Sequence, residues 1–251
     1  MASHRPPKTI LAIDIGGSNM KILVTGQTER RRAPTGRTFT PQRLIEVVAE
    51  LAKDWEYEAI SVGYPGPVGD HGPRSEAGNL GPGWVGFNFA AAFDKPVRIV
   101  NDAAMQALGC YEGGRMLFLG LGTGLGSALI ADNVIIQLEL GRVRGNRGRR
   151  LGRVLSDAGR KAAGNRLWRR AVARTVADLR SAFLADDVVI GGGNAKLFRD
   201  PPSGARLGNN LAAFRGGFRL WHIDDVPTHD GTEEPPPSPD AHESRSEWRL
   251  I

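Results

Sequence analysis

Apolar runs closed by glycine-rich turns recur along the chain and predict strands. The run Thr9–Ile15 indicates a buried strand, which a glycine turn connects to a returning strand over Met20–Thr25. The same order recurs later, where Met116–Gly120 and Ser127–Ile136 are predicted strands joined by Leu121–Gly126. Further short strands are expected at Arg30–Phe39, Ala59–Gly63, Pro96–Val100 and Asp187–Ile190. The pattern therefore favours a protein rich in short, buried strands.

Apolar residues at helical spacing predict helices between these strands. The first helix spans Pro41–Trp55, with Thr40 as its N-cap and Pro41 at its first position. Asp102–Tyr111 is a second expected helix, and Asn165–Phe183 is an amphipathic third. The apolar face of the third helix consists of Leu167, Trp168, Ala171, Val172, Val176, Leu179 and Phe183. The segment Leu211–Trp221 is expected to close the core.

Two halves that each open with a strand, a glycine turn and a strand predict a duplicated α/β arrangement. We expect an N-terminal α/β lobe over residues 1–107 and a C-terminal α/β lobe over residues 108–221, with a cleft between them. The tail, residues 222–251, is proline-rich and acidic, and we expect it to be disordered.

Composition narrows the class of protein. The chain has 251 residues, of which 41% are hydrophobic and 24% charged, so a packed core is expected. No apolar run approaches the roughly 20 residues of a membrane span. The N-terminus lacks a secretory pattern, and the single cysteine, Cys110, excludes an internal disulfide framework. We therefore expect a cytoplasmic protein without a membrane partner.

The charge of the chain is unevenly distributed. Residues 222–251 contain eight acidic residues and two arginines, so residues 1–221 carry about +12 although the whole chain is +6. A strongly basic body favours an anionic partner, such as a nucleotide, polyphosphate or nucleic acid. Nucleic acid is the least favoured of these, because the arginine-rich segment has no interleaved aromatic residues for base stacking.

Three glycine-rich turns are candidate phosphate-binding sites. In the first, Asp14 ends a strand before the turn of Gly16, Gly17 and Ser18, so that a carboxylate, backbone amides and a hydroxyl are adjacent. The second contains Gly122, Thr123 and Gly124 within four closely spaced glycines. The third contains Gly191, Gly192 and Asn194 between a strand and an expected short helix. Each turn alone could equally be an ordinary hairpin or cap, whereas all three in this order favour nucleotide or phosphate binding.

Four polar residues are candidates for handling a hydroxylated substrate. Asp102 lies at a strand end, where a carboxylate could accept the proton of an attacking hydroxyl, and Asn101 could bind a second hydroxyl. Asp102 could instead be only the N-cap of the following helix. Asn79 and Glu139 could bind further hydroxyls of a sugar, although a turn residue and a surface acid are the structural alternatives.

Taken together, these residues resemble the ROK-family sugar kinases of the actin-like ATPase superfamily, most closely the polyphosphate glucokinases, from about Ile10 to Trp221. The resemblance implies a two-lobed, ribonuclease H-like fold with a central cleft. It implies Asp102 as the catalytic base, and Asn101 and Glu139 as glucose ligands. It also implies that the three turns hold the phosphates. Mg²⁺, held by Asp14 directly or through water, is the expected cofactor. The implied reaction transfers a phosphoryl group from polyphosphate or ATP to the 6-hydroxyl of glucose or a related hexose. A homodimer is usual in the family.

Two features depart from the family pattern. The cysteines of the structural zinc motif found in many members are lacking, as in polyphosphate glucokinases, so no zinc is expected. Arg142 stands where the family has a histidine that contacts the sugar, and it begins a basic segment that could bind polyphosphate or be a solvated loop. The arginines of this candidate polyphosphate track are Arg142, Arg144, Arg147, Arg149 and Arg150. The alternative function is a degenerate kinase that binds sugar or phosphate without turnover.

Overall fold

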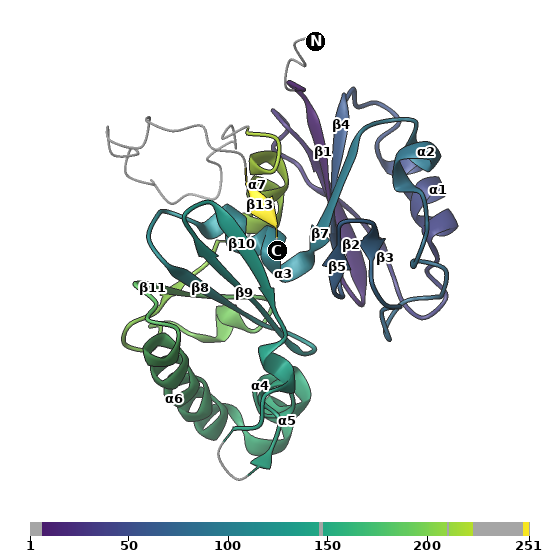
Figure 1. Cartoon of the computed structure of the whole chain (residues 1–251). Coiled ribbons are helices and arrows are strands. Elements are labelled where there is room, and N and C mark those ends of the chain that lie inside the picture. The colour runs from purple at the N-terminus through teal and green to yellow at the C-terminus, as the bar shows by residue number, and fades with distance from the viewer. Residues whose placement is uncertain (1–6, 146–147, 210, 223–247, 251) are drawn as a thin grey trace. The chain divides into compact units, whose positions relative to one another are not determined.

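The computed structural model describes residues 7–145, 148–209, 211–222 and 248–250. These residues form two compact units, each built on one mixed β-sheet with helices on its faces (Figure 1). Unit 1 consists of the described residues of Met1–Val100 and Phe214–Trp248, and unit 2 of those of Asn101–Ala213 and Arg249–Ile251. In the part of the chain so described, no helix is both long and apolar enough to span a membrane.

The sheet of unit 1 has five strands in the order β3-β2-β1-β4-β7. Its strands are β1 (Ile10–Ile15), β2 (Asn19–Val24), β3 (Arg31–Pro34), β4 (Ala59–Tyr64) and β7 (Val97–Asn101). The short strands β5 (Val68–Gly69) and β6 (Gly72–Pro73) pair with each other in a glycine- and proline-rich stretch. β1 pairs antiparallel with β2 and parallel with β4, so this central strand is hydrogen-bonded to a neighbour along both edges.

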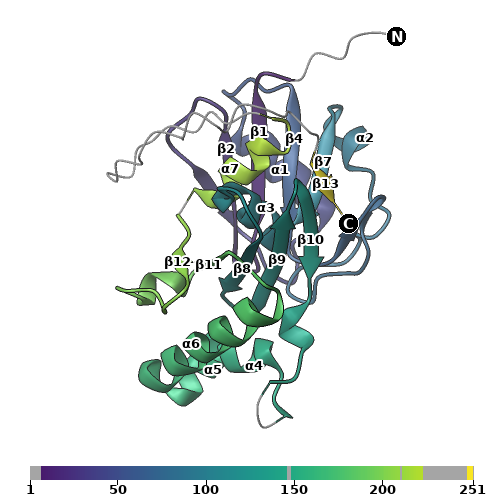
Figure 2. The ribbon, with the colours of Figure 1, turned by 60° about the vertical axis from the view of Figure 1, so that its left-hand side comes forward.

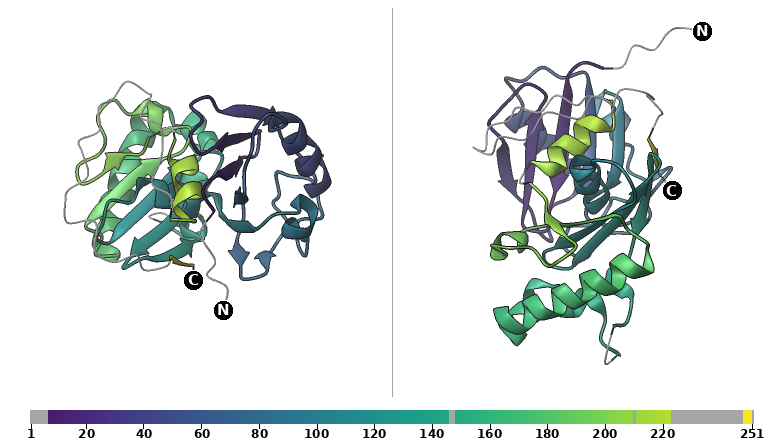
Figure 3. Two further views of the ribbon diagram at one scale, coloured as in Figure 1. Left: turned by 90° about the horizontal axis from the view of Figure 1, so that it is seen from above. Right: turned by 90° about the vertical axis from the view of Figure 1, so that its left-hand side faces the viewer.

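Helices cover both faces of the unit 1 sheet. Helix α1 (Pro41–Leu51) begins as expected, because the Thr40 side chain accepts a hydrogen bond from the Arg43 amide and Pro41 occupies the first turn. Leu44, Val47 and Val48 of α1 pack on the sheet in a core that includes Trp84 and Phe89, the first residue of the short helix α2 (Phe89–Phe93). On the opposite face lies α7 (Ala212–Arg219), coloured yellow-green in Figure 3.

The sheet of unit 2 has six strands in the order β12-β11-β8-β9-β10-β13. Their bounds are β8 (Met116–Leu121), β9 (Leu125–Ala131), β10 (Val134–Leu138), β11 (Asp187–Gly191), β12 (Arg206–Leu207) and β13 (Arg249–Leu250). β8 pairs antiparallel with β9 and parallel with β11. Leu117, Leu119 and Leu121 of β8 point to the same face of the sheet, where they share a hydrophobic core with Trp168 and Val172.

Helices also cover both faces of the unit 2 sheet. Helix α3 (Asp102–Cys110) lies on one face, and α4 (Leu151–Leu155), α5 (Asp157–Ala163) and α6 (Asn165–Ala182) lie on the other (Figure 2). Two 3₁₀ helices, η1 (Leu140–Arg142) and η3 (Ala195–Leu197), follow β10 and β11. Trp168 of α6 is buried against Phe198 and donates a 3.0 Å hydrogen bond to the Leu155 carbonyl, which ties α6 to α4.

The two units share one local arrangement. In unit 1 the first hairpin and the parallel strand beside it run β2-β1-β4, and in unit 2 the corresponding strands run β9-β8-β11. In both cases a glycine-rich turn joins the first two strands of the unit's sheet. This arrangement agrees with the duplication predicted from the sequence.

Two details of the predicted elements are wrong. Ser127–Ile136 was expected to be one strand, but Asp132 and Asn133 adopt positive φ angles of 49° and 59° and turn the chain between β9 and β10. Leu167 was assigned to the apolar face of its helix, yet it is 53% exposed, because the buried face of α6 is carried by Trp168, Val172, Thr175 and Val176.

The division into units differs from the expected lobe boundaries. The N-terminal lobe was expected to extend to residue 107. Its last seven residues, 101–107, instead belong to unit 2. Phe214–Trp221 belongs to unit 1, because the Ser61 hydroxyl donates a 2.6 Å hydrogen bond to the Gly217 carbonyl and accepts one from the Trp221 indole at 2.9 Å. The expected disordered tail lies mostly outside the described residues, but Arg249 and Leu250 within it form β13 beside β10.

Candidate active site

The first glycine turn closes the β1–β2 hairpin of unit 1. The Gly16 amide donates a 3.0 Å hydrogen bond to the Asn19 carbonyl, and an added Cβ at Gly16 would lie only 2.8 Å from that oxygen. Only glycine therefore fits this position without a shift of backbone. Within the described residues, the amides of Gly17 and Ser18 have no hydrogen-bond partner. The turn thus offers two amides, rather than three, to an anion.

Asn79 packs directly on this turn. A Cβ added to Gly17 would overlap the Asn79 side-chain amide, so a larger residue at position 17 would displace that amide. Asn79 is half-buried, and Ser18 is exposed at the tip of the turn. Asp14, Gly16, Gly17, Ser18 and Asn79 are therefore brought together in unit 1.

The Asp14 carboxylate lies at the end of β1, next to this turn. Its side chain is 15% exposed, and Lys21 Nζ of the opposite strand lies 3.8 Å from Asp14 Oδ2. Burial raises the pKa of the Asp14 carboxyl above its ordinary value, and the Lys21 ammonium partly opposes that rise in pKa. The described residues contain no cluster of three or more metal-ligating side chains, so Asp14 is a lone candidate ligand. A single carboxylate is sufficient for Mg²⁺ when phosphate oxygens and waters supply the other ligands.

The candidate base lies in unit 2, in the first turn of α3. Asn101 caps this helix, because its Oδ1 accepts hydrogen bonds from the amides of Ala103 and Ala104 at 3.0 and 3.2 Å. Asp102 Oδ1 also accepts from the Ala103 amide, at 2.8 Å. Asn101 is thus the N-cap of α3. The alternative that Asp102 is only the N-cap of this helix is therefore not supported. Any ligand contact of Asn101 would use Nδ2, since capping uses Oδ1.

The second glycine turn lies beside this helix start. An added Cβ at Gly126 would be 2.9 Å from the Ala103 Cβ, so the start of α3 and the β8–β9 hairpin are in close contact. Positions 122 and 124 face open space, because an added Cβ there would meet no atom within 4 Å. The Gly122 amide bonds to the Gly124 carbonyl at 3.1 Å, and Thr123 is exposed. Unit 2 thus packs Ala103, the residue after Asp102, on Gly126 at the end of an open, glycine-lined turn.

The third turn packs against the second. The Asn194 amide donates a 2.9 Å hydrogen bond to the Leu121 carbonyl, and Gly192 has a φ angle of +79°. An added Cβ at Gly192 would lie 2.5 Å from that carbonyl oxygen, so the backbones of the second and third turns are in contact. The short helix expected after the turn is the 3₁₀ helix η3, which begins at Ala195. Asn194 is 9% exposed, and among the described residues its Nδ2 has no hydrogen-bond partner.

A further backbone contact supports the second turn from α5. The Asp157 amide donates a 2.8 Å hydrogen bond to the Gly122 carbonyl, and Ser156 caps α5 through the Gly159 amide. Asp157 itself is paired with Arg160 and Lys161, which lower the pKa of its carboxyl. The carboxylate of Asp157 is therefore occupied by cations of its own helix, and its contribution to the turn is structural.

Glu139 is held at the end of β10 by a buried serine. The Ser127 hydroxyl donates to the Leu138 carbonyl at 2.7 Å and accepts from the Leu140 amide at 3.2 Å, which fixes the chain on both sides of Glu139. Because Leu138 pairs with Ser127, Glu139 follows at the position across from Gly126. Arg142 Nε lies 3.5 Å from Glu139 Oε2, and both side chains are more than half exposed.

The arginine-rich segment folds as a small hairpin instead of an open loop. Arg144 and Arg150 form an antiparallel bridge, and the Gly145 amide bonds to the Arg149 carbonyl at 2.9 Å. The backbones of Gly141 and Gly152 touch at its base, where a Cβ on Gly152 would lie 2.9 Å from the Gly141 carbonyl. The exposed arginines of this arginine hairpin are Arg144, Arg149 and Arg150, and the exposed Arg142 of η1 and Arg153 of α4 flank it in the sequence. Arg147, also predicted for the track, lies outside the described residues.

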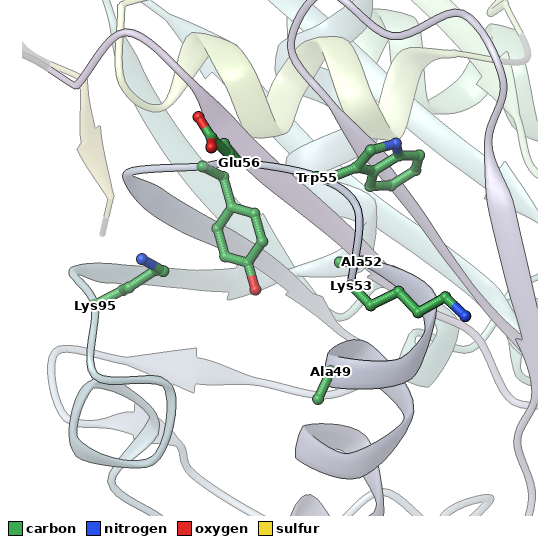
Figure 4. A pocket seen from close by; sticks show the side chains of 7 residues that line it. Ala49, Ala52, Lys53, Trp55, Glu56 and Lys95 are labelled. Atoms are coloured by element: carbon green, nitrogen blue, oxygen red, sulfur yellow. The ribbon is translucent and has the colours of Figure 1, made fainter.

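A hollow of about 380 Å³ on unit 1 contains none of the candidate residues (Figure 4). Its lining residues are Ala49, Ala52, Lys53, Trp55, Glu56, Tyr57 and Lys95. Lys95 Nζ lies 5.2 Å from the centre of the Tyr57 ring, which accounts for its position.

Sequence reasoning missed two residues that contact the first turn or the adjacent Asp14. Lys21 could have been found, because a hairpin closed at residues 16–19 places it opposite Asp14. Thr35, whose hydroxyl donates a 2.6 Å hydrogen bond to the Gly16 carbonyl, had no such signal. Its contact depends on how β3 pairs with β2, and the alternation of apolar residues does not specify that register.

Comparison with other sequences identifies relatives. Residues 10–148 match the model of the ROK family. The chain is 30% identical over 204 residues to a polyphosphate glucokinase of Mycobacterium leprae (strain TN), an alignment that covers 72% of this chain and 62% of that protein. It is 29% identical over 202 residues to a polyphosphate glucokinase of Mycobacterium tuberculosis (strain H37Rv), with 72% and 76% covered.

Solved structures show the same fold. An inorganic polyphosphate/ATP-glucomannokinase from Arthrobacter sp. strain KM is 24% identical with a TM-score of 0.69, and the match covers 84% of this chain and 96% of that one. A ROK family glucokinase from Streptomyces griseus, in complex with glucose and AMPPNP, is 18% identical with a TM-score of 0.67, and 84% and 98% are covered. The predicted actin-like ATPase fold is thereby confirmed. Because the family model matches more than half of its residues, the chain belongs to the ROK family.

Proposed function

We propose that this protein is a sugar kinase that transfers the terminal phosphoryl group of polyphosphate or ATP to the 6-hydroxyl of glucose or a related hexose. The position of Asp102 carries the proposal. The carboxylate lies at the start of a helix that is capped by Asn101. The next residue of that helix, Ala103, packs on Gly126, which follows the open turn at Gly122 and Gly124. Membership of the ROK family and the names of the relatives agree with this reaction.

In the proposed reaction, Asp102 accepts the proton of the 6-hydroxyl while that oxygen attacks the terminal phosphorus. The bond between this phosphorus and the bridging oxygen breaks, and the shortened polyphosphate or ADP leaves with the bond's electrons. The amides of Gly17 and Ser18, and those of Thr123 and Gly124 in the second turn, would donate hydrogen bonds to phosphate oxygens. The buried Asn194 amide group is a further donor of this kind.

Mg²⁺ is the proposed cofactor, and Asp14 is the residue that would hold it, directly or through water. Bound Mg²⁺ would neutralise the negative charge of the donor phosphates. The chemistry of the site fits this ion, because Asp14 supplies one carboxylate and the donor supplies oxygens. The Lys21 ammonium favours the ionised form of Asp14 that a metal needs.

The choice of donor is proposed from the arginine hairpin. Arg144 and Arg150 form its antiparallel bridge, Arg149 precedes Arg150, and all three residues are exposed. Guanidinium groups bind phosphate oxygens in pairs, and a repeating polyanion could engage several of them at once. We therefore favour polyphosphate over ATP. We also propose that the enzyme is cytoplasmic, because a chain with one cysteine forms no internal disulfide bond.

A second candidate function is a binding protein without turnover, and one observation favours it. Arg142 pairs with Glu139, the proposed sugar ligand, so a sugar hydroxyl would have to compete with a guanidinium group for that carboxylate. Such competition weakens acceptor binding at Glu139.

The test measures glucose 6-phosphate formation with polyphosphate and with ATP for the wild type, Asp102→Asn and Asp132→Asn. We expect Asp102→Asn to lower turnover by about 10²- to 10⁴-fold. Asp132→Asn is the matched control, since this exposed turn residue has a φ angle of 49°, which asparagine tolerates. Equal turnover of Asp102→Asn and the wild type would overturn the assignment of the base. A glucose-induced thermal shift without turnover with either donor would establish the binding protein instead.

A further inference from the structure

We propose that Thr35 is a positioning residue that orients the Gly17 amide toward the donor phosphate. Thr35 directly follows β3, and its hydroxyl donates a 2.6 Å hydrogen bond to the Gly16 carbonyl. Its amide donates a 3.0 Å hydrogen bond to the Ser18 carbonyl. One residue outside the turn therefore holds two of the turn's carbonyl groups. The proposal rests on the proposed phosphoryl transfer at this site.

The geometry of the peptide bond links Thr35 to the phosphate. The Gly16 carbonyl and the Gly17 amide belong to one planar trans peptide, in which the C=O and N–H point in opposite directions. When Thr35 binds the carbonyl, the Gly17 N–H must point away from Thr35. Among the described residues this N–H has no protein partner, so it remains available to a ligand. Thr35 thus fixes the direction of the amide without touching the ligand itself.

A Gly-Gly peptide needs such a restraint more than other peptides do. Without side chains, Gly16 and Gly17 can adopt backbone angles that other residues avoid, so the peptide between them can rotate at little cost. A rotated peptide would present a carbonyl oxygen, rather than an N–H, to the phosphate, and two oxygens would repel. The half-buried Thr35 hydroxyl is shielded in part from water and favours the orientation that binds an anion.

The test compares Thr35→Val, which removes the hydroxyl at nearly constant volume, with Thr35→Ser, which keeps it. The matched control is Thr25→Val. Thr25 Oγ1 accepts a 3.1 Å hydrogen bond from the Ile10 amide at the other end of the same hairpin, away from the turn. For each variant, the KM for polyphosphate and ATP, the KM for glucose, and the Tm are measured.

We expect Thr35→Val to raise the KM for the donor about tenfold, which corresponds to the loss of one directed hydrogen bond. The KM for glucose should stay unchanged, Thr35→Ser should restore the donor KM, and Thr25→Val should leave it at the wild-type value. An unchanged donor KM in Thr35→Val would overturn the proposal. An equal rise in Thr25→Val would do the same, because it would show a general loss of hairpin stability.

A binding measurement separates this proposal from that of the function. Calorimetric titration of tripolyphosphate into the wild type and Thr35→Val needs no turnover. If neither protein phosphorylates glucose but Thr35→Val binds tripolyphosphate about tenfold more weakly, the role of Thr35 stands and the kinase function fails. Equal affinities, or no binding by the wild type, overturn the role of Thr35.

Discussion

Lys21 Nζ lies 3.8 Å from Asp14 Oδ2, and the two residues face each other across the β1–β2 pair. Burial raises the pKa of the Asp14 carboxyl, whereas the positive charge of Lys21 lowers it. The pair therefore sets the pH at which Asp14 becomes an anion able to hold a metal.

Replacing Lys21 should make the catalytic activity more sensitive to acid. Lys21→Met removes the charge that lowers the pKa of Asp14, so this pKa should rise further and the acid limb of the kcat/KM profile should move to higher pH. Lys21→Arg, which keeps the charge, should leave the limb near its wild-type position. An acid limb that does not move in Lys21→Met would show that Asp14 is not the group that titrates there.

The same pair predicts how stability changes with pH. A folded-state pKa above 3.8 means that folded protein binds the Asp14 proton more tightly than the unfolded chain does. The contribution of Asp14 to the free energy of unfolding is therefore largest in acid and is lost as pH rises from 3.8 through the folded-state pKa. Lys21→Met should enlarge this loss, as denaturant titrations at several pH values would detect.

Gly192 and Gly193 should respond differently to alanine. Gly192 has a φ angle of +79° and an added Cβ would lie 2.5 Å from the Leu121 carbonyl, whereas a Cβ on Gly193 would meet no atom within 4 Å. We expect Gly192→Ala to lower the free energy of unfolding by about 2 kcal/mol or more. Gly193→Ala should change it by less than about 0.5 kcal/mol. Chemical denaturation measures both, and equal losses would contradict the described turn.

Adjacent residues of α6 offer a similar contrast. Trp168 is 1% exposed and Leu167 is 53% exposed. Trp168→Ala should cost about 3–5 kcal/mol, because it leaves a cavity beside Phe198 and an unpaired Leu155 carbonyl. Leu167→Ala should cost less than about 0.5 kcal/mol. If the two losses measured by urea unfolding were alike, the face of α6 that packs on the sheet would be assigned wrongly.

The arginine hairpin should govern the use of polyphosphate. Neutralising Arg144, Arg149 and Arg150 with glutamine should raise the KM for polyphosphate and reduce its dependence on salt, while the KM for ATP changes little. The matched control replaces Arg166, Arg170 and Arg174, three exposed arginines of α6, and so removes the same charge elsewhere in unit 2. Equal effects of the two triple variants would indicate general attraction by a basic surface instead of a track.

Local signals were sufficient to predict most elements. The cap at Thr40 and the proline at position 41 located the start of α1, and apolar runs closed by glycine-rich turns located β1 and β8. The turn at Asp132 and Asn133 was missed, because the apolar residues on both sides continue without a glycine or proline. The pairing of Thr35 with Gly16 could not be predicted from local patterns, because it depends on strand register.

The route of the chain also has a consequence for its synthesis. The unit 1 sheet is complete at β7, yet α7, which covers its second face, is made more than a hundred residues later. Until then Phe214 and Phe218 are missing, and Ser61 at the centre of that face has neither the Gly217 carbonyl nor the Trp221 indole to bond with. A chain emerging from the ribosome must therefore finish nearly all of unit 2 before unit 1 can mature, which makes the nascent N-terminal sheet a natural client for a chaperone.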